Sequence, residues 1–167
     1  DVTRLVRPTR DARQILLAFK FLGADYLGPH LADAMVRRLP APERCVEVAA
    51  VPATGRARRS RGYHPAEVLA ASVAARLAIP FRRELLRKTR ETRVQSRVPA
   101  AERSANVRRA FRVDARPAGG VLLIDDVATS GATARECARR LAAAGARPIT
   151  VWCFARASRL DLEREAA

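Results

Sequence analysis

The residues best able to do chemistry lie in the stretch 121–133, which reads VLLIDDVATSGAT. Its first four residues are aliphatic, as in a strand that is buried on both faces of a parallel sheet. Two carboxylates, Asp125 and Asp126, come next, and small hydroxyl residues with Gly131 lead into an alanine-rich helical pattern. Open α/β sheets bind ligands at the carboxyl ends of their strands, and free backbone N–H groups at a helix start favour an anion. The stretch therefore predicts a phosphate site with two acids beside it.

The two acids restrict the kind of anion that this site can take. Carboxylates repel a phosphate group directly, but they accept hydrogen bonds from sugar hydroxyls and suit a Mg²⁺ ion held between them and the ligand. A phosphorylated sugar that carries Mg²⁺ satisfies both halves of the stretch. A P-loop is excluded because no lysine lies near Gly131, and the G-x-G-x-x-G fingerprint of dinucleotide sites is absent. The alternatives are an ordinary strand–turn–helix with a capped helix, or the acidic pocket of a receiver domain.

The stretch resembles the signature of the type I phosphoribosyltransferases, which bind phosphoribosyl pyrophosphate (PRPP). The resemblance implies that the two acids are catalytic and that they hold Mg²⁺ indirectly. The phosphoribosyl-binding residues that it implies are Asp125, Asp126, Val127, Ala128, Thr129, Ser130, Gly131, Ala132 and Thr133. In these enzymes a turn equivalent to residues 50–54 holds the pyrophosphate. The residues implied for that role are Pro52, Ala53, Thr54 and Arg59.

The rest of the chain alternates between strand-like and helix-like patterns, which predicts the scaffold for this site. Apolar residues at helical spacing predict helices at 10–21, 27–39, 65–79 and 133–144. Short apolar runs predict strands at 45–51, 81–87, 111–113, 121–124 and 149–154. Residues 88–105 show little periodicity, so we expect a mobile segment with a short helix near 99–106. The alternation predicts one α/β domain over 1–167, with an open, mainly parallel sheet and helices on both faces, as in type I phosphoribosyltransferases.

Further motifs, in a fixed order, are similar to the ComF family, which comprises phosphoribosyltransferase-like proteins tied to DNA uptake in naturally competent bacteria. They are RGY at 61–63 with AEVLA at 66–70, RETRVQ at 90–95, and RSANVRRAF at 103–111, followed by 121–133. The resemblance implies a single-stranded DNA role and, as partners, competence DNA-translocation proteins such as a helicase.

The sequence departs from the family pattern at two points. Family members often begin with a four-cysteine zinc module, but Cys45, Cys137 and Cys153 lie far apart and match neither a zinc spacing nor a disulfide framework. Such cysteine usage predicts a reducing cytoplasm. Many relatives have Asn-Gln where His64 and Pro65 stand, and we expect His64 to begin a helix rather than to act as a general base.

A strong basic excess gives the second functional signal. The chain holds 32 Lys and Arg against 17 acids, and residues 82–116 alone hold twelve against four. One interpretation is a loop that closes over PRPP, with Lys88 and Arg93 as catalytic residues near the leaving pyrophosphate. Another is single-stranded DNA bound mainly by charge, because aromatic residues are scarce there. The residues predicted for DNA are Arg82, Arg83, Arg87 and Arg90. A solvated surface is the third interpretation.

Two classes of function follow. The first is an adaptor that binds PRPP or a related phosphoribosyl ligand with Mg²⁺ and serves natural transformation. The second is a metabolic phosphoribosyltransferase, which needs residues that read a base, and only Tyr63, Trp152 and Phe154 stand near the motifs. No apolar run approaches the roughly 20 residues of a membrane helix, so we expect no membrane insertion. The sequence leaves open whether transfer occurs and which oligomer forms.

Overall fold

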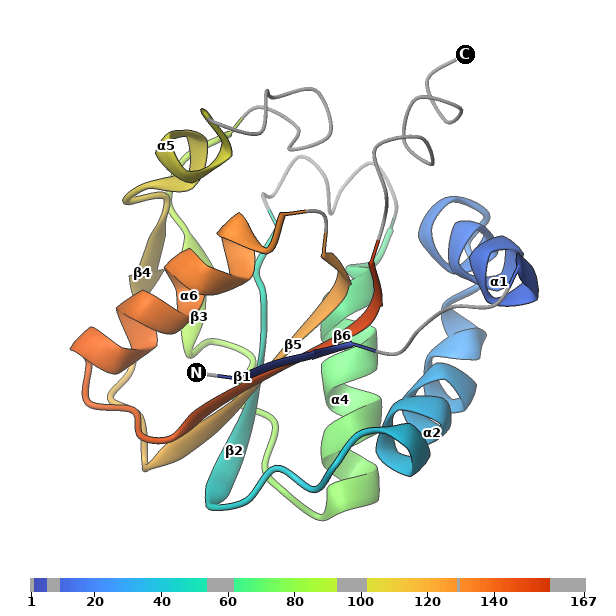
Figure 1. Cartoon of the computed structure of the whole chain (residues 1–167), viewed down its shortest axis with the longest axis horizontal. Helices are drawn as coiled ribbons and strands as arrows, with labels where there is room; N and C mark the ends of the chain where they lie inside the picture. Colours follow the sequence, from blue (N-terminus) through green and yellow to red (C-terminus); the bar gives the residue numbers. More distant parts are fainter. Residues whose placement is uncertain (1, 6–9, 54–61, 93–101, 129, 157–167) are drawn as a thin grey trace.

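A four-stranded parallel sheet forms the centre of the molecule, in the order β1–β6–β5–β2 (Figure 1). Its strands are β1 (Val2–Leu5), β6 (Ile149–Arg156), β5 (Gly120–Ala128) and β2 (Cys45–Ala50). The structure is a computed structural model, and it describes residues 2–5, 10–53, 62–92, 102–128 and 130–156. β5 lies between β2 and β6, with Ile124 level with Ala50 on one side and Trp152 on the other.

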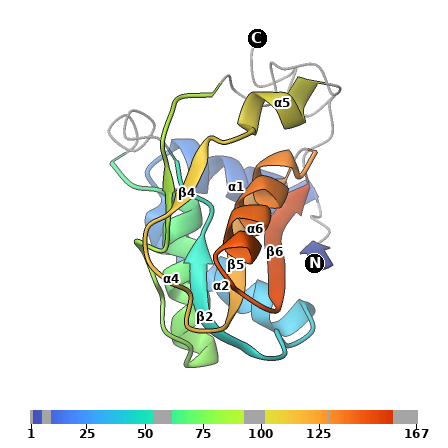
Figure 2. The same ribbon diagram turned by 90° about the vertical axis from the view of Figure 1, so that its left-hand side faces the viewer.

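Helices cover both faces of this sheet, as the sequence predicts. Helices α1 (Arg10–Phe21), α2 (Gly28–Arg38) and α4 (Pro65–Leu77) pack on one face. The other face carries α6 (Ala132–Ala143) and, beside it, a small two-stranded antiparallel sheet formed by β3 (Leu86–Lys88) and β4 (Phe111–Val113) (Figure 2). A short 3₁₀ turn, η1 (Asp25–Leu27), joins α1 to α2, and α5 (Arg103–Val107) precedes β4.

The alternation of side chains along β5 explains the two-sided core. Leu122 and Ile124 belong to the cluster under α2 and α4, whereas Val121 and Leu123 belong to the cluster under α6. All four side chains are fully buried. A strand with both faces covered in this way must be apolar throughout, which is the pattern that residues 121–124 show.

The start of α4 confirms the structural interpretation of His64. This residue is the N-cap of α4, and its Nδ1 atom accepts a hydrogen bond from the backbone N–H of Glu67 at 3.2 Å. Pro65 occupies the first turn, where its missing N–H leaves no bond unmade. The imidazole therefore stabilises a helix end.

Three expectations about strands need correction. β5 extends to Ala128, so Asp125 and Asp126 lie within the strand rather than after it. The predicted strand at 81–87 is only a single bridge from Phe81 to Val48, followed by β3, which pairs antiparallel with β4 outside the main sheet. β1 was not predicted, because half of its four residues are polar and its pairing with β6 is long-range.

Within the described residues, no helix is long and apolar enough to cross a membrane.

Candidate functional site

The acid pair lies near the carboxyl end of β5, the central strand of the site. Asp125 is 8% exposed, and its Oδ1 atom accepts the backbone N–H of Asp126 at 3.0 Å. Asp126 is slightly more open, and its Oδ1 atom accepts the N–H of Val127 at 2.9 Å. Both side chains are thus held in place by the backbone that carries them, where a parallel sheet presents ligands to its strand ends.

A lysine that the motif analysis missed completes the pair. Lys20, in the last turn of α1, places its Nζ atom 3.2 Å from Oδ2 of Asp126. The sequence sets Lys20 apart in one respect, because it is one of only two lysines among the 32 basic residues of the chain. Its distance from the motif along the chain hid it, since only the packing of α1 against the sheet brings the two together.

The pKa values of the two acids shift in opposite directions. Burial raises the pKa of Asp125 well above its usual value, and the neighbouring charge of Asp126 and a hydrogen bond to it raise the pKa further. Burial acts on Asp126 in the same direction, but the charge of Lys20 and the hydrogen bonds that Asp126 accepts outweigh it and lower its pKa. The pair therefore favours one proton on Asp125 and a negative charge on Asp126, next to the positive charge of Lys20.

The turn after β5 has the backbone shape expected of an anion loop. Gly131 is the N-cap of α6 and has a φ of 70°, in the left-handed region that favours glycine. The hydroxyl of Ser130 accepts the N–H of Ala132 at 3.3 Å. Residues 125–133 thus bring the predicted phosphoribosyl segment together at one sheet end, although Thr129 lies outside the described residues.

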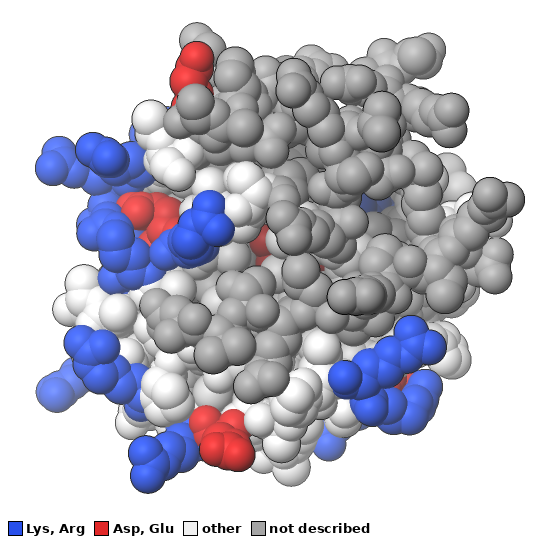
Figure 3. All heavy atoms as spheres, viewed as in Figure 1, with Lys and Arg blue, Asp and Glu red and all other residues white. Residues whose placement is uncertain are grey.

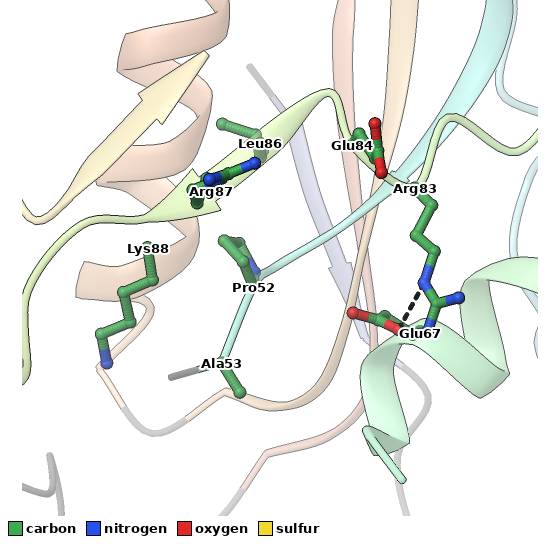
Figure 4. Close-up of a pocket in the computed structure, with 8 residues that line it drawn as sticks. All are labelled: Pro52, Ala53, Glu67, Arg83, Glu84, Leu86, Arg87 and Lys88. Carbon is green, nitrogen blue, oxygen red and sulfur yellow. Dashed lines mark hydrogen bonds and ion pairs between the residues drawn. The ribbon is translucent and has the colours of Figure 1, made fainter. Parts of the chain in front are cut away.

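A cleft of about 350 Å³ lies beside this loop region, between the turn after β2 and the β3 strand (Figure 4). It joins two groups that the sequence predicted separately, Pro52 and Ala53 for pyrophosphate and Lys88 for catalysis. The remaining lining residues are Glu67, Arg83, Glu84, Leu86 and Arg87. Thr54, Arg59 and Arg93, which were predicted for the same region, lie outside the described residues.

Lys88 is a partly buried residue of the cleft wall. Its Nζ atom donates to Oγ1 of Thr92 at 2.8 Å and lies 5.8 Å from the centroid of the Phe111 ring. Burial lowers the pKa of Lys88. On the α6 face, burial raises the pKa of the Cys137 thiol, the charge of Asp125 adds to this rise, and Lys88 opposes it.

Comparison with known proteins places the chain in a family. No family model matches the sequence. The DNA utilization protein YhgH of Salmonella typhi is 32% identical over 126 residues, which cover 73% of this chain and 54% of that protein. Competence protein F of Haemophilus influenzae is 33% identical over 101 residues, which cover 58% of this chain and 44% of that protein. The chain belongs to the ComF-like family. It spans about half the length of the curated relatives that it matches.

Solved structures confirm the fold of this ComF-like chain. The glutamine PRPP amidotransferase of B. subtilis, complexed with ADP and GMP, aligns with a TM-score of 0.50 and 20% identity, over 83% of this chain and 30% of that one. A structure of the allosteric regulatory enzyme of purine biosynthesis aligns over the same shares, with a TM-score of 0.51 and 21% identity. The chain therefore has the fold of the type I phosphoribosyltransferases.

The arginines that the sequence assigned to DNA have partners within the ComF-like chain. Arg82 pairs with Glu47 at 3.2 Å, Arg83 pairs with Glu67 at 2.8 Å, and Arg87 pairs with Asp114 at 2.7 Å. Arg90 donates to the backbone carbonyls of Asn106 and Arg108, both at 2.9 Å. Figure 3 shows a similar arrangement on one face of the molecule, where acidic side chains lie beside clusters of Lys and Arg. DNA binding by these arginines stays a prediction.

The carboxylates of the site are the side chains that could help to bind Mg²⁺. Within the described ranges, no three or more His, Cys, Asp or Glu side chains gather in a way that could hold a metal ion. The ComF-like site offers two carboxylates, one of which already contacts an ammonium. Such a set suits a Mg²⁺ ion that is bound mainly by ligand phosphates and water, because Mg²⁺ keeps several waters and needs few protein ligands. It fits an ion that arrives with the ligand.

Proposed function

We propose that this ComF-like chain binds PRPP, or a related phosphoribosyl ligand, with Mg²⁺ at the end of β5, and that it serves DNA uptake or utilization in the cytoplasm. One observation carries the proposal: the buried Asp125 and the partly buried Asp126 lie near the end of β5, in the same short segment as the left-handed Gly131 that begins α6. The fold supports it, since the solved structures with this fold include an enzyme whose name contains PRPP. The names of the curated relatives support the DNA role.

Each part of the ligand has a matching group in this proposal. The ribose hydroxyls donate to Asp125 and Asp126, whose oxygens can accept more than one hydrogen bond each. The 5-phosphate accepts from backbone N–H groups around Gly131 and the first turn of α6, where the helix dipole also favours an anion. The pyrophosphate lies toward the cleft of Pro52, Ala53 and Lys88, and Mg²⁺ supplies positive charge to its oxygens.

The same arrangement is suited to the chemistry of phosphoribosyl transfer. Loss of pyrophosphate leaves positive charge on the sugar ring and negative charge on the leaving group. Lys88, which is half-buried and lines the cleft with Pro52 and Ala53, would stabilise that leaving charge. The residues noted as base readers do not favour the metabolic alternative, because Trp152 and Phe154 are at most 3% exposed and Tyr63 packs against the core.

The DNA role is proposed to involve competence DNA-translocation proteins, such as a helicase, and single-stranded DNA. Arg82, Arg83 and Arg87 keep 41%, 54% and 64% of their side chains exposed despite their ion pairs. Guanidinium groups have five N–H donors, so an arginine bound to one carboxylate can still contact a phosphate. This binding would be weak and independent of sequence.

Calorimetry with PRPP and Mg²⁺ tests the ligand part of the proposal. We expect the wild type to bind and Asp125→Ala plus Asp126→Ala to lose all measurable heat, because the ribose hydroxyls lose their acceptors. Asp33→Ala plus Glu43→Ala is the matched control, since it also removes two carboxylates, both remote from the motif, and should bind as the wild type does. Absence of heat from the wild type with PRPP, ribose 5-phosphate and a nucleoside monophosphate would refute the proposal.

A further inference from the structure

Lys20 makes a contact that the phosphoribosyl signature does not include. Its Nζ atom lies 3.2 Å from Oδ2 of Asp126, and the side chains of the two residues are 21% and 16% exposed. The other oxygen of Asp126 accepts the N–H of Val127 at 2.9 Å. Each oxygen of Asp126 therefore has a donor, and the charge of this carboxylate is matched by a residue that comes from α1, more than a hundred positions away in the chain.

This contact answers a charge problem in the site. A carboxylate that is largely withdrawn from water, as Asp126 is, repels an anion strongly, because solvent and salt screen it poorly. Among the ion pairs of the described residues, the one from Lys20 is the only one made to Asp125 or Asp126. With Lys20 in place, one negative charge of the pair is cancelled before any ligand arrives.

The use of lysine at this position fits the same role. Of the 32 basic residues in the chain, only Lys20 and Lys88 are lysines. Both belong to the proposed site, since Lys20 contacts Asp126 and Lys88 lines the cleft. An ammonium is a compact charge with three N–H donors, whereas a guanidinium is a flat group that fills more space. An ammonium that donates one N–H to Asp126 keeps two N–H groups that can donate to ligand oxygens.

We infer that Lys20 is a charge-balancing and positioning residue of the phosphoribosyl site, which holds Asp126 and cancels its charge so that an anionic sugar can bind beside the acid pair. This inference rests on the proposed function. It also gives α1 a role in binding, because the helix delivers a charge to the end of β5 from the sheet face opposite α6.

The test is calorimetry with ribose 5-phosphate in a low-salt buffer that contains EDTA, so that no metal contributes. We expect Lys20→Met to bind at least about tenfold more weakly than the wild type, the size of one lost charge-assisted contact. Lys20→Arg should recover most of the affinity because it restores the charge. Arg38→Met, an exposed residue in the last turn of α2, removes the same charge elsewhere and should bind within about twofold of the wild type.

Salt separates charge balance from packing, because only an electrostatic deficit narrows as ions screen it. The affinity gap between wild type and Lys20→Met should therefore shrink when salt is raised. Circular dichroism checks that the variants are folded, and Lys20→Gln replaces the Met variant if that one is not.

Three results overturn the inference. If Lys20→Met binds as tightly as the wild type, Lys20 has no role and the proposed function stands without it. If the gap between wild type and Lys20→Met does not change with salt, and Lys20→Arg is as weak as Lys20→Met, the side chain acts through shape and not through charge. If the wild type binds neither ribose 5-phosphate nor PRPP, the proposed function is wrong and the inference falls with it.

Discussion

Two carboxylates of almost equal burial behave in opposite ways in this molecule. Asp125 on β5 is 8% exposed and Glu136 on α6 is 9% exposed. Glu136 accepts the N–H of Arg109 at 3.0 Å and ion-pairs with Arg139 and Arg140, at 2.8 Å and 3.0 Å. Hydrogen bonding from Arg139, with smaller contributions from the other donors, lowers its pKa to about 2. The pKa of Asp125 is instead raised well above its usual value by burial.

The difference shows that the partners of a carboxylate, together with its burial, decide in which direction its pKa shifts. Glu136 has its full set of donors and joins α6 to the segment before β4, so it has no need of a ligand. Glu47 is similar, since it is 1% exposed, accepts the N–H of Ala118 at 2.9 Å and pairs with Arg82. Asp125 has one backbone donor and a second carboxyl as its neighbour. A ligand hydroxyl would supply the donor that this site lacks.

The comparison predicts that damage around Asp125 reduces binding and that damage around Glu136 reduces stability. The largest effect is expected for Gly131→Val. A side chain there blocks the backbone from the phosphate, so PRPP binding should lose at least about 2 kcal/mol. The left-handed φ of 70° should make the variant less stable by about 1–2 kcal/mol. Calorimetry and thermal melting measure the two losses.

Gly145→Val is the matched control for this prediction. Gly145 also has a positive φ, 99°, and a Cβ atom there would meet nothing within 4 Å. It should cost a similar amount of stability and leave PRPP binding unchanged. If Gly145→Val weakens binding as much as Gly131→Val does, the glycine in the loop acts on the fold and not on the phosphate.

Glu136→Ala gives the next largest effect, on the structural side of the comparison. Removal of the carboxylate leaves the Arg109 N–H without its acceptor and two arginines without their ion-pair partner. We expect the free energy of unfolding at pH 7 to fall by about 2 kcal/mol, a figure that allows for the solvent exposure of the arginines. The folded pKa of about 2 lies below the usual value of 4.5, so this stabilisation is complete above pH 4.5 and is lost as the pH falls toward 2.

Denaturant unfolding of Glu136→Ala and the wild type between pH 3 and 7 measures this loss. A difference that stays constant over the whole range would show that the carboxylate charge is not responsible.

Asp125→Asn sharpens the comparison because its pH dependence should have the opposite sign. The folded protein holds the Asp125 proton to higher pH than the unfolded chain, so wild-type stability falls as the pH rises from 3.8 through the raised pKa. Asparagine has no proton to lose. We therefore expect Asp125→Asn to melt at a higher temperature than the wild type at pH 8. A lower melting temperature at pH 8 would contradict the raised pKa.

The smallest effect concerns single-stranded DNA and tests whether structural ion pairs can also serve binding. We expect weak binding with a logarithmic salt slope of about −0.7 per phosphate neutralised. Replacing Arg82, Arg83, Arg87 and Arg90 by Ser should flatten that slope, while Phe81→Ala should change it little. A titration at about 50 mM salt, which favours polyanion binding, decides the matter. No detectable binding there would limit the DNA role to partner proteins.

Local patterns predicted most of the fold, and long-range pairing accounts for the rest. The helices and the buried β5 strand follow from periodicity and from end signals such as His64 and Gly131. β1 and the β3–β4 pair depend on partners far along the chain, and short segments of mixed polarity give no local sign of them. The extension of β5 through Asp125 and Asp126 has the same cause, since β6 pairs with it as far as Ala128.

Residues of the candidate site that are contiguous could be grouped from the sequence, as in the motif at 125–133. The structure also places Pro52, Ala53 and Lys88, which were predicted separately, around one cleft. Their roles stay a prediction. The sequence could not indicate that three of the four predicted DNA-binding arginines pair with acids elsewhere in the chain, because such pairs form only after the chain has folded. Lys20 was missed for the same reason.

The most direct test of the account is calorimetry of wild type and Asp125→Asn with PRPP and Mg²⁺ at pH 8, where the melting temperature of each confirms that it is folded. The amide matches the shape of the carboxyl but cannot accept as a carboxylate does. We predict that the wild type binds and that Asp125→Asn, although no less stable, binds at least about tenfold more weakly. Equal affinity for PRPP in the two proteins would contradict the claim that Asp125 is the ligand-binding acid of this molecule.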